Sequence, residues 1–282
     1  MKKLAALLSV LVACPISVLG GQLSPPNRAG VAMGHLHYRV REVEANKRFW
    51  MALGGTSIKV GETDVVKFPD TLIFLSQGES SGGSLGSVIN HVAFRVRTFA
   101  ALEATGVHVQ PLAQFPGVGS VTTPEGERIE LFEESSENLV FTLDPGERDA
   151  AAERHSRRMT VPIIAHHVHL NVPEGAEANA KTWYVKTFGG VPGKRWHYEA
   201  ADLPGINMNF SGSTSVQAPT KGRMLDHVGF EVRNLEAFCR KLTSGGVKLD
   251  VPYTRQPTGI ATAWLTDPWG TSIELTEGLS RF

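Results

Sequence analysis

The feature that most constrains the fold is a short segment that occurs four times along the chain. Aligned without gaps, the copies share a histidine at the second position and apolar residues at alternate positions after it. They are Gly34–Val40, Asn90–Val96, His166–Val172 and Asp226–Val232. This alternation is typical of a β-strand with one buried face. A fourfold recurrence predicts a fold built from repeated units.

Each predicted strand precedes a helical pattern of apolar residues. Helices are expected over residues 44–53, 99–104, 178–188 and 235–244, and each pattern ends close to a glycine, the residue that most often terminates a helix. Short strands are expected after the helices, for example over residues 71–76 and 206–210. The repeated unit is therefore a strand, a helix and then several strands.

The second and fourth units share a further ending. Thr123-Pro-Glu-Gly126 precedes Arg128-Ile-Glu-Leu131, and Asp267-Pro-Trp-Gly270 precedes Ser272-Ile-Glu-Leu275. Proline and glycine at these places predict a tight turn that leads into a final strand. Because isoleucine and leucine flank the glutamate in each strand, Glu130 and Glu274 are expected to point away from the apolar face.

The composition is that of a soluble globular protein, with 41% hydrophobic and 20% charged residues. The 28 Lys and Arg residues equal the 28 Asp and Glu residues, so the formal net charge is zero. Binding to phosphate groups needs a basic excess, so the balance argues against nucleic acid or an anionic membrane surface as a partner. We expect a small-molecule partner and either a monomer or a homodimer.

The first twenty residues are predicted to be a bacterial-type signal peptide. Lysines near the start precede the apolar run 4–13, and small residues follow as far as a cleavage site after Gly20. The run is too short to span a bilayer. The predicted location is therefore the periplasm or the exterior of the cell. A lipid anchor at Cys14 is the alternative, but Pro15 directly after the cysteine argues against it.

The repeats and the composition divide the remaining chain into two predicted domains, residues 33–135 and 162–280. The linker between them, residues 136–161, is dense in charge and poor in periodic apolar residues. Cleavage of the signal would leave Cys239 as the only cysteine, which excludes a disulfide within one chain. Cys239 lies in a helical pattern and is expected in the core.

The polar faces of the predicted strands carry two histidines and one glutamate in each half. The first set is His35, His91 and Glu130, and the second is His167, His227 and Glu274. Two imidazoles and a carboxylate suit a divalent metal such as Fe, Mn, Zn or Ni, and they leave coordination positions open. A single strand histidine is more often structural, but the recurrence of all three residue types favours a metal site in at least one half. If the units paired across a dimer instead, the same ligands would be regrouped.

The His-Val-x-Phe-x-Val strands, the helix ending in Phe-Gly-Gly and the Asp-Pro-x-Gly-x-x-Ile-Glu-Leu ending resemble the vicinal oxygen chelate superfamily of glyoxalases, extradiol dioxygenases and bleomycin resistance proteins. The resemblance covers nearly all of the chain after the signal. It implies an α+β fold in which four βαβββ modules pair into two cupped barrels. It also implies metal ligands on the first and last strands of modules, at the same six residues.

Departures from the family pattern leave the reaction open. Glyoxalase I adds a glutamate from the last strand of its first module, where this chain has Phe74, and in the second half the place falls on Asn207 or Asn209. Extradiol dioxygenases have a tyrosine four residues before the turn proline, where this chain has Ser120 and Trp264. The expected metal ligands fit either class, whereas the residues around them fit neither.

His37 and His169 lie two residues beyond a predicted ligand on the same strand face. They could act as general acid or base, because imidazole titrates near neutral pH, or they could be lining residues bonded to a neighbouring strand. Together with Glu274 they are the candidate catalytic residues. The histidines at positions 108, 155 and 197 are expected at the surface, and His166 is expected on the opposite strand face.

The leading functional prediction is an exported, metal-dependent, lyase- or dioxygenase-like enzyme that acts on a small oxygenated, metal-chelating substrate. The second half is favoured as the active site, because it keeps the fuller ending around Glu274 and has asparagines near the metal. The alternative is a non-catalytic protein that binds or sequesters a small molecule, as resistance proteins of this fold do. A third reading is an accessory protein whose ligand sets are remnants of duplication.

Overall fold

The computed structural model describes residues 23–136, 140–147, 155 and 157–282. The predicted signal peptide, residues 1–20, lies outside the described residues together with Cys14 and the cleavage site. Within the described ranges, no helix combines the length and the apolar character needed to cross a membrane.

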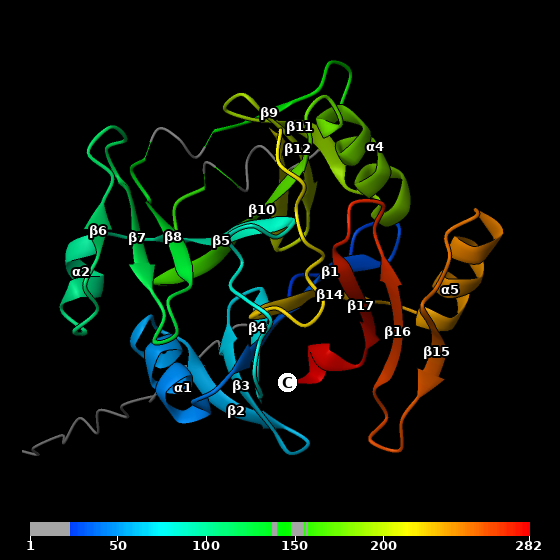
Figure 1. The fold of residues 1–282 in the computed structure, drawn as a ribbon, viewed down its shortest axis with the longest axis horizontal. Coiled ribbons are helices and arrows are strands. Elements are labelled where there is room, and N and C mark those ends of the chain that lie inside the picture. The colour runs from blue at the N-terminus through cyan, green and yellow to red at the C-terminus, as the bar shows by residue number, and fades with distance from the viewer. Residues whose placement is uncertain (1–22, 137–139, 148–154, 156) are drawn as a thin grey trace, which may run out of the picture.

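Four βαβββ units follow one another along the chain, as the repeat predicts (Figure 1). Unit 1 consists of β1 (Val31–Val40), α1 (Val43–Ala52), β2 (Thr56–Val60), β3 (Thr63–Phe68) and β4 (Thr71–Gln77). Unit 2 consists of β5 (Ile89–Val96), α2 (Phe99–Glu103), β6 (Gln110–Pro111), β7 (Val118–Thr122) and β8 (Arg128–Glu133).

The second half repeats the pattern. Unit 3 consists of β10 (Ile163–Pro173), α4 (Glu177–Phe188), β11 (Val191–Arg195), β12 (Tyr198–Leu203) and β13 (Ile206–Ser213). Unit 4 consists of β14 (Leu225–Val232), α5 (Leu235–Ser244), β15 (Val251–Arg255), β16 (Ala261–Thr266) and β17 (Ser272–Glu277). The short strand β9 (Phe141–Leu143) lies between the halves, and the 3-10 helix η2 (Leu279–Arg281) ends the chain.

The predicted helices are confirmed to within one residue at each end. Helix α5 has the expected bounds, and α4 begins one residue earlier than expected. Gly189 follows α4 in the left-handed conformation at φ 71°, where its N–H bonds to the carbonyl of Val185. Glycine adopts this conformation without a steric penalty, so the Gly-Gly signal marks the helix end correctly.

Each of the two described sheets combines one unit from each half of the chain. The order β15-β16-β17-β14-β1-β4-β3-β2 joins units 4 and 1, and we call it the 1–4 sheet. The order β6-β7-β8-β5-β10-β13-β12-β11-β9 joins units 2 and 3, and we call it the 2–3 sheet. The sheets are joined at their centres by the antiparallel pairs β1–β14 and β5–β10.

This pairing corrects the predicted domain division. The ranges 33–135 and 162–280 delimit the sequence halves, but neither half forms a sheet of its own. All four first strands carry the same alternating pattern, so the local pattern cannot select which two strands pair. The selection depends on side-chain packing between segments that are distant in sequence.

The predicted linker, residues 136–161, is also more structured than its composition indicates. Only part of it is described, but within that part β9 pairs with β11 at the edge of the 2–3 sheet. His155, which was expected at the surface, is buried with its Nε2 2.7 Å from Asp202 Oδ1. The prediction failed because the segment gains its order from contacts with unit 3 and not from a periodic pattern of its own.

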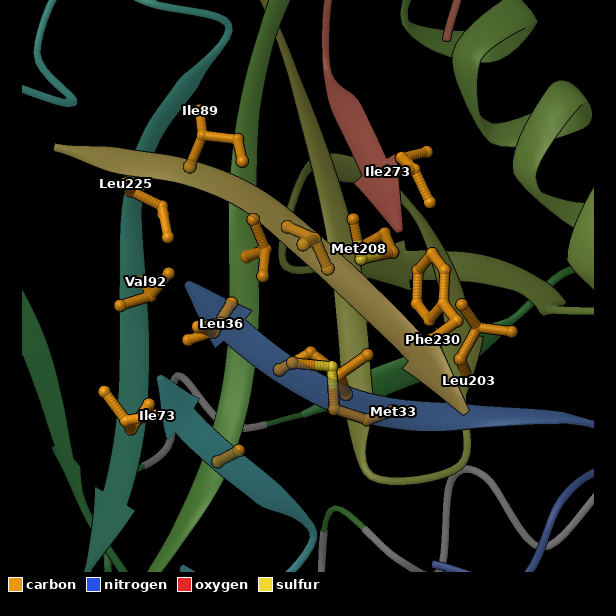
Figure 2. Close-up of a cluster of buried hydrophobic side chains, with 14 of the residues drawn as sticks. Met33, Leu36, Ile73, Ile89, Val92, Leu203, Met208, Leu225, Phe230 and Ile273 are labelled. Atoms are coloured by element: carbon orange, nitrogen blue, oxygen red, sulfur yellow. The ribbon is translucent and has the colours of Figure 1, made fainter. Parts of the chain in front are cut away.

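A large apolar core lies between the two sheets and the helices (Figure 2). Leu36 of β1 and Phe230 of β14 belong to the same buried cluster as Val92 of β5 and Met208 of β13. Because side chains alternate along a strand, the histidines next to these apolar residues project from the opposite faces of the sheets. The core thus positions both polar strand faces away from the shared interior.

Candidate metal centres

The 1–4 site brings together His35 of β1, His227 of β14 and Glu274 of β17. The Nε2 atoms of His35 and His227 lie 3.3 Å apart. Glu274 Oε2 lies 3.0 Å from the first of these atoms and 3.3 Å from the second. Both histidines are almost completely buried, whereas the glutamate side chain is 15% exposed. Three potential metal-binding atoms therefore converge on one point on the polar face of the 1–4 sheet.

The 2–3 site has the same construction from His91 of β5, His167 of β10 and Glu130 of β8. The two histidine Nε2 atoms lie 3.2 Å apart. Glu130 Oε2 lies 3.1 Å from Nε2 of His91 and 3.6 Å from Nε2 of His167. The two sites are thus two copies of one arrangement, one on each sheet.

The structure regroups the predicted ligand sets. The sequence halves suggested His35 with His91 and Glu130, and His167 with His227 and Glu274, and this grouping is wrong. Every member of the six lies in one of the two sites, but each site takes the histidine of its neighbouring strand in the other half. The physical reason is the pairing of β1 with β14 and of β5 with β10.

The donor spacing fits a first-row divalent metal. Zinc-type bonds to histidine and carboxylate are about 2.0–2.2 Å long. With ligand–metal–ligand angles of roughly 90–118°, such bonds hold their donor atoms about 3.0–3.6 Å apart. The measured separations in both sites fall within this range. Two neutral imidazoles and one carboxylate would hold the ion and leave positions open for a substrate or water.

A β-bulge precedes the first histidine of each site. The register of β1 against β14 shifts between Met33 and His35, and that of β10 against β5 shifts between Ala165 and His167. A bulge re-aims the side chain that follows it, which explains its place beside a site. The bulge also corrects the expectation that His166 and His167 point to opposite strand faces. Nδ1 of His166 lies 2.8 Å from Nδ1 of His167, so the two rings are neighbours.

Gly229 gives His35 the room that it occupies. It lies opposite His35 in the ladder, and a Cβ built on it would come within 2.0–2.5 Å of the imidazole ring. Real atoms do not approach this closely, so only glycine at this position is compatible with the observed ring. The 2–3 sheet has Ala93 at the equivalent place, opposite His167.

A third histidine joins each cluster. His37 and His169 can each offer a nitrogen within 4.8 Å of the donor atoms of the two histidine ligands. Nε2 of His37 lies 2.8 Å from Ser76 Oγ, and Nε2 of His169 lies 2.5 Å from Ser211 Oγ. Each histidine is therefore hydrogen-bonded to the parallel neighbouring strand, as the sequence-based alternative described.

Burial keeps most of these imidazoles neutral. It lowers the pKa of His37 to about 3, assisted by the neighbouring His227, and it lowers the pKa of His35 despite a hydrogen bond to Glu274. Burial also lowers the pKa of His167 and His169 well below the ordinary value. A neutral imidazole is the form that binds a metal, so the folded chain presents His35 and His167 in the required state.

His227 and Glu274 form the charged part of the 1–4 site. Burial acts to lower the pKa of His227, but hydrogen bonds to Asp226 and Glu274 outweigh it and raise that pKa. Burial acts to raise the pKa of Glu274, but hydrogen bonds from His227 and His35 outweigh it and lower that pKa. Glu274 is therefore ionised at neutral pH and would need no deprotonation to accept a metal.

The cavities beside the two sites differ in chemistry. The 1–4 cavity has a volume of about 320 Å³, and its lining combines threonines and a glutamine with apolar side chains beside His35 and Glu274. The 2–3 cavity has a volume of about 120 Å³, and aromatic and aliphatic side chains share its lining with His91, His167 and Glu130.

The residues at the place of the additional glyoxalase I glutamate, Phe74 and Asn209, also belong to other sites than the sequence halves suggested. Phe74, expected beside the first-half ligands, packs with its ring centroid 4.9 Å from that of His35 and so belongs to the 1–4 site with Glu274. Asn209 lines the 2–3 cavity with Glu130. The expectation that asparagines accompany Glu274 is therefore wrong, because unit 3 pairs with unit 2.

Sequence reasoning missed the residues that contact the histidines from behind. Ser76 and Ser211 bond the third histidines, and Asp226 and Asn90 lie 2.7 Å from Nδ1 of His227 and His91. A comparison of the repeats contained a usable signal. A polar residue stands directly before the histidine in units 2 and 4, and a serine stands two residues after Phe74 and after Asn209.

The chain belongs to the Glyoxalase/Bleomycin resistance protein/Dioxygenase superfamily, whose family description matches residues 32–275. The predicted α+β fold of paired βαβββ modules is confirmed. No curated protein matches the chain in sequence.

Similar solved structures share the fold at low sequence identity. Glyoxalase I from Zea mays aligns with a TM-score of 0.60 and 14% identity, covering 89% of this chain and 94% of its own. A candidate dioxygenase from Bacillus subtilis subsp. subtilis strain 168 aligns with a TM-score of 0.62 and 14% identity, covering 91% of this chain and 86% of its own. At such identity the likeness establishes the fold and not the reaction.

We expect Gly229→Ala to displace the His35 ring and to reduce metal binding at the 1–4 site. Overpacking of this kind costs about 1–3 kcal/mol of stability. Urea unfolding and metal analysis would measure both effects. Gly245→Ala is the control, because its Cβ would meet its neighbours at an ordinary 3.4 Å. Unchanged metal binding in Gly229→Ala would contradict the steric argument.

We expect the metal-free protein to lose stability as the pH falls from 7.5 to 5.5. The unfolded chain takes up protons on His35, His37, His167 and His169 near pH 6.5, whereas the folded chain resists them. Stability therefore rises with pH over this window, by up to about 1.4 kcal/mol per pH unit for each such histidine below its unfolded pKa. The pKa of His227 is raised on folding, so its contribution to stability decreases as the pH rises, and this offsets only part of the effect.

Urea unfolding in the presence of chelator at three pH values would measure this dependence. His37→Asn should reduce the slope, while the same change at the exposed His108 should leave it unaltered. A stability that stays constant or increases on acidification would show that these histidines are not held neutral by burial.

Proposed function

We propose that the protein is a metal-dependent enzyme whose reaction centre is the 1–4 site. The observation that carries the proposal is the convergence of His35, His227 and Glu274, with donor atoms 3.0–3.3 Å apart on a buried strand face. These residues would hold a divalent ion of Fe, Mn, Zn or Ni. When bound, such an ion supplies a Lewis acid that polarises substrate oxygens.

The remaining residues of the site would orient the substrate. His37 is neutral at physiological pH and its Nε2 is bonded to Ser76, so its other ring nitrogen could hydrogen-bond a substrate hydroxyl. Its pKa of about 3 makes it a weak base, so its proposed role is to position the substrate. Trp264 packs beside the site, with its ring 4.5 Å from that of His227. Of the predicted catalytic residues, Glu274 and His37 thus serve one site, and His169 would have the corresponding role in the other.

The lining of the 1–4 cavity mixes polar side chains with the apolar Val60, Ile260 and Leu279, and its polar part suits a small oxygenated substrate. Thr63, Thr258 and Thr262 contribute hydroxyls, and Gln256 contributes an amide, within a volume of about 320 Å³. Groups of this kind donate to and accept from several oxygens of one ligand. We therefore propose a substrate with adjacent oxygens, of which some would reach the metal and others these side chains.

Export is proposed from the sequence. The charged start, the short apolar run and the small residues up to Gly20 support it. A periplasmic or extracellular enzyme would have to retain its metal without the cytoplasmic supply, and the burial of His35 and His227 is consistent with slow loss.

We expect Glu274→Gln to abolish metal-dependent turnover and to weaken metal binding at the 1–4 site by at least about tenfold, because one charged ligand is lost. The protein would be purified without chelator, its metals identified, and turnover assayed on small compounds with adjacent oxygens after loading with Fe, Mn, Zn or Ni. Glu236→Gln removes the same charge from the exposed face of α5 and should change nothing. Full turnover in Glu274→Gln would exclude the 1–4 site as the reaction centre.

A second candidate function is the binding of an apolar small molecule at the 2–3 site. Trp196 is 58% exposed, an unusual state for this residue, and stands at the mouth of the cavity with its ring 5.6 Å from Phe115. Its backbone has a φ of 52°, which a bulky residue adopts only at a cost. Within the described chain, the buried Asn209 Oδ1 in the same cavity has no hydrogen-bond partner and could accept from a ligand.

This candidate predicts that metal-stripped protein binds the aromatic probe 8-anilinonaphthalene-1-sulfonate. Trp196→Ala should weaken the probe about tenfold, since aromatic stacking is worth roughly 1–3 kcal/mol. Leu85→Ala, at a residue that is 79% exposed and does not line the cavity, is the control. Equal binding by both variants would remove the 2–3 cavity as a ligand site.

A further inference from the structure

The two sites have the same three types of candidate ligand, but the side chains that contact these ligands differ in charge. Asp226 contacts His227 in the 1–4 site, and Arg128 contacts His91 in the 2–3 site. We infer that the 1–4 site binds a divalent metal at least tenfold more tightly than the 2–3 site, and that Asp226 and Arg128 set this difference. The inference rests on the proposed metal dependence and adds which residues make the two duplicated centres unequal.

In the 1–4 site, a carboxylate supports the histidine ligand. Asp226 Oδ1 lies 2.7 Å from Nδ1 of His227 and accepts a hydrogen bond from the N–H of that nitrogen. The lone pair of Nε2 is then free to bind a metal. The other carboxylate oxygen accepts the backbone N–H of Gly222 at 2.7 Å, which fixes the carboxylate. A carboxylate behind a histidine ligand raises the basicity of the ligand and strengthens metal binding.

In the 2–3 site, the equivalent position is Asn90, which carries no charge. Its Oδ1 lies 2.7 Å from Nδ1 of His91. Arg128 adds a positive charge at the same place: Nη2 lies 2.8 Å from Nδ1 of His91, and Nη1 lies 3.4 Å from Oε1 of Glu130. The guanidinium is always charged and can only donate, whereas Asn90 Oδ1 can only accept from a ring N–H, so Nδ1 of His91 cannot satisfy both partners in one tautomer. Donation from Arg128 to Nδ1 would place the ring proton on Nε2, the nitrogen that a metal needs free.

A count of the charges at each site predicts which site binds a cation more tightly. In the metal-bound state, in which the histidine ligands are neutral, the 1–4 site has the two negative charges of Glu274 and Asp226, whereas Arg128 offsets the charge of Glu130 in the 2–3 site. The cavity linings add to the contrast, with Glu62 in the 1–4 cavity and Arg195 in the 2–3 cavity. A divalent cation is therefore attracted to the first site and meets a positive neighbour in the second.

The repeat allows the two charges to be tested at matched positions. Arg128 stands two residues before Glu130, and the residue two before Glu274 is Ser272. Arg128→Ser therefore gives the 2–3 site the residue type of its counterpart, and Arg128→Lys keeps the charge. Asp226→Asn gives the 1–4 site the amide of Asn90 in nearly the same shape.

The experiment is a competition titration of metal-stripped, full-length protein with Zn²⁺ against a chromophoric chelator, with the bound metal counted by elemental analysis. In the unaltered protein we expect one tight equivalent and a second at least tenfold weaker. His35→Ala should remove the tight equivalent and His167→Ala the weak one. Circular dichroism would confirm that each variant is folded.

Arg128→Ser should raise the Zn²⁺ affinity of the 2–3 site at least tenfold, whereas Arg128→Lys should leave that affinity low. Asp226→Asn should lower the Zn²⁺ affinity of the 1–4 site. Arg240→Ser removes the same charge from the exposed face of α5 and should alter neither. Two equivalents of equal affinity, unchanged in Arg128→Ser, would overturn the inference and leave the proposed function intact. Absence of bound metal at both sites would overturn both.

Discussion

The antiparallel pairing of β1 with β14, and of β5 with β10, is the contact on which the rest of the structure depends. Each pair joins two units into one continuous sheet and brings two histidine nitrogens to 3.2–3.3 Å from one another. The parallel neighbours β17 and β8 then supply the glutamates. Neither half of the chain contains a complete ligand set, so the sites form only when distant segments have folded together.

The packing that stabilises the fold also prepares the chemistry. Apolar residues such as Leu36 and Val92 fill the space between the sheets, and alternation along the strands places the histidines on the other faces. Burial there lowers the pKa of His35 and His167 and so keeps them neutral. The cost of burying polar side chains is reduced where they bond to one another, to Ser76 and Ser211, or to Asp226.

The sequence predicted local features well and long-range pairing poorly. Helix α5 and the end of α4 at Gly189 followed from periodicity and from the tendency of glycine to terminate a helix, both of which are properties of neighbouring residues. The choice of the six candidate ligands followed from the repeat. Their grouping did not, because four strands with one pattern offer several equivalent partners. The burial of His155 was missed for a related reason, since its partner Asp202 is distant in sequence.

The exchange of units between halves has a consequence for how the two centres can change. Two copies of a two-unit chain, related by a twofold axis, would form the same pair of sheets, and every substitution would then appear in both centres. Joining the copies in one polypeptide removes that symmetry. Position 128 can carry arginine while position 272 carries serine. Covalent fusion thus allows the residues around one centre to change while those around the other stay the same.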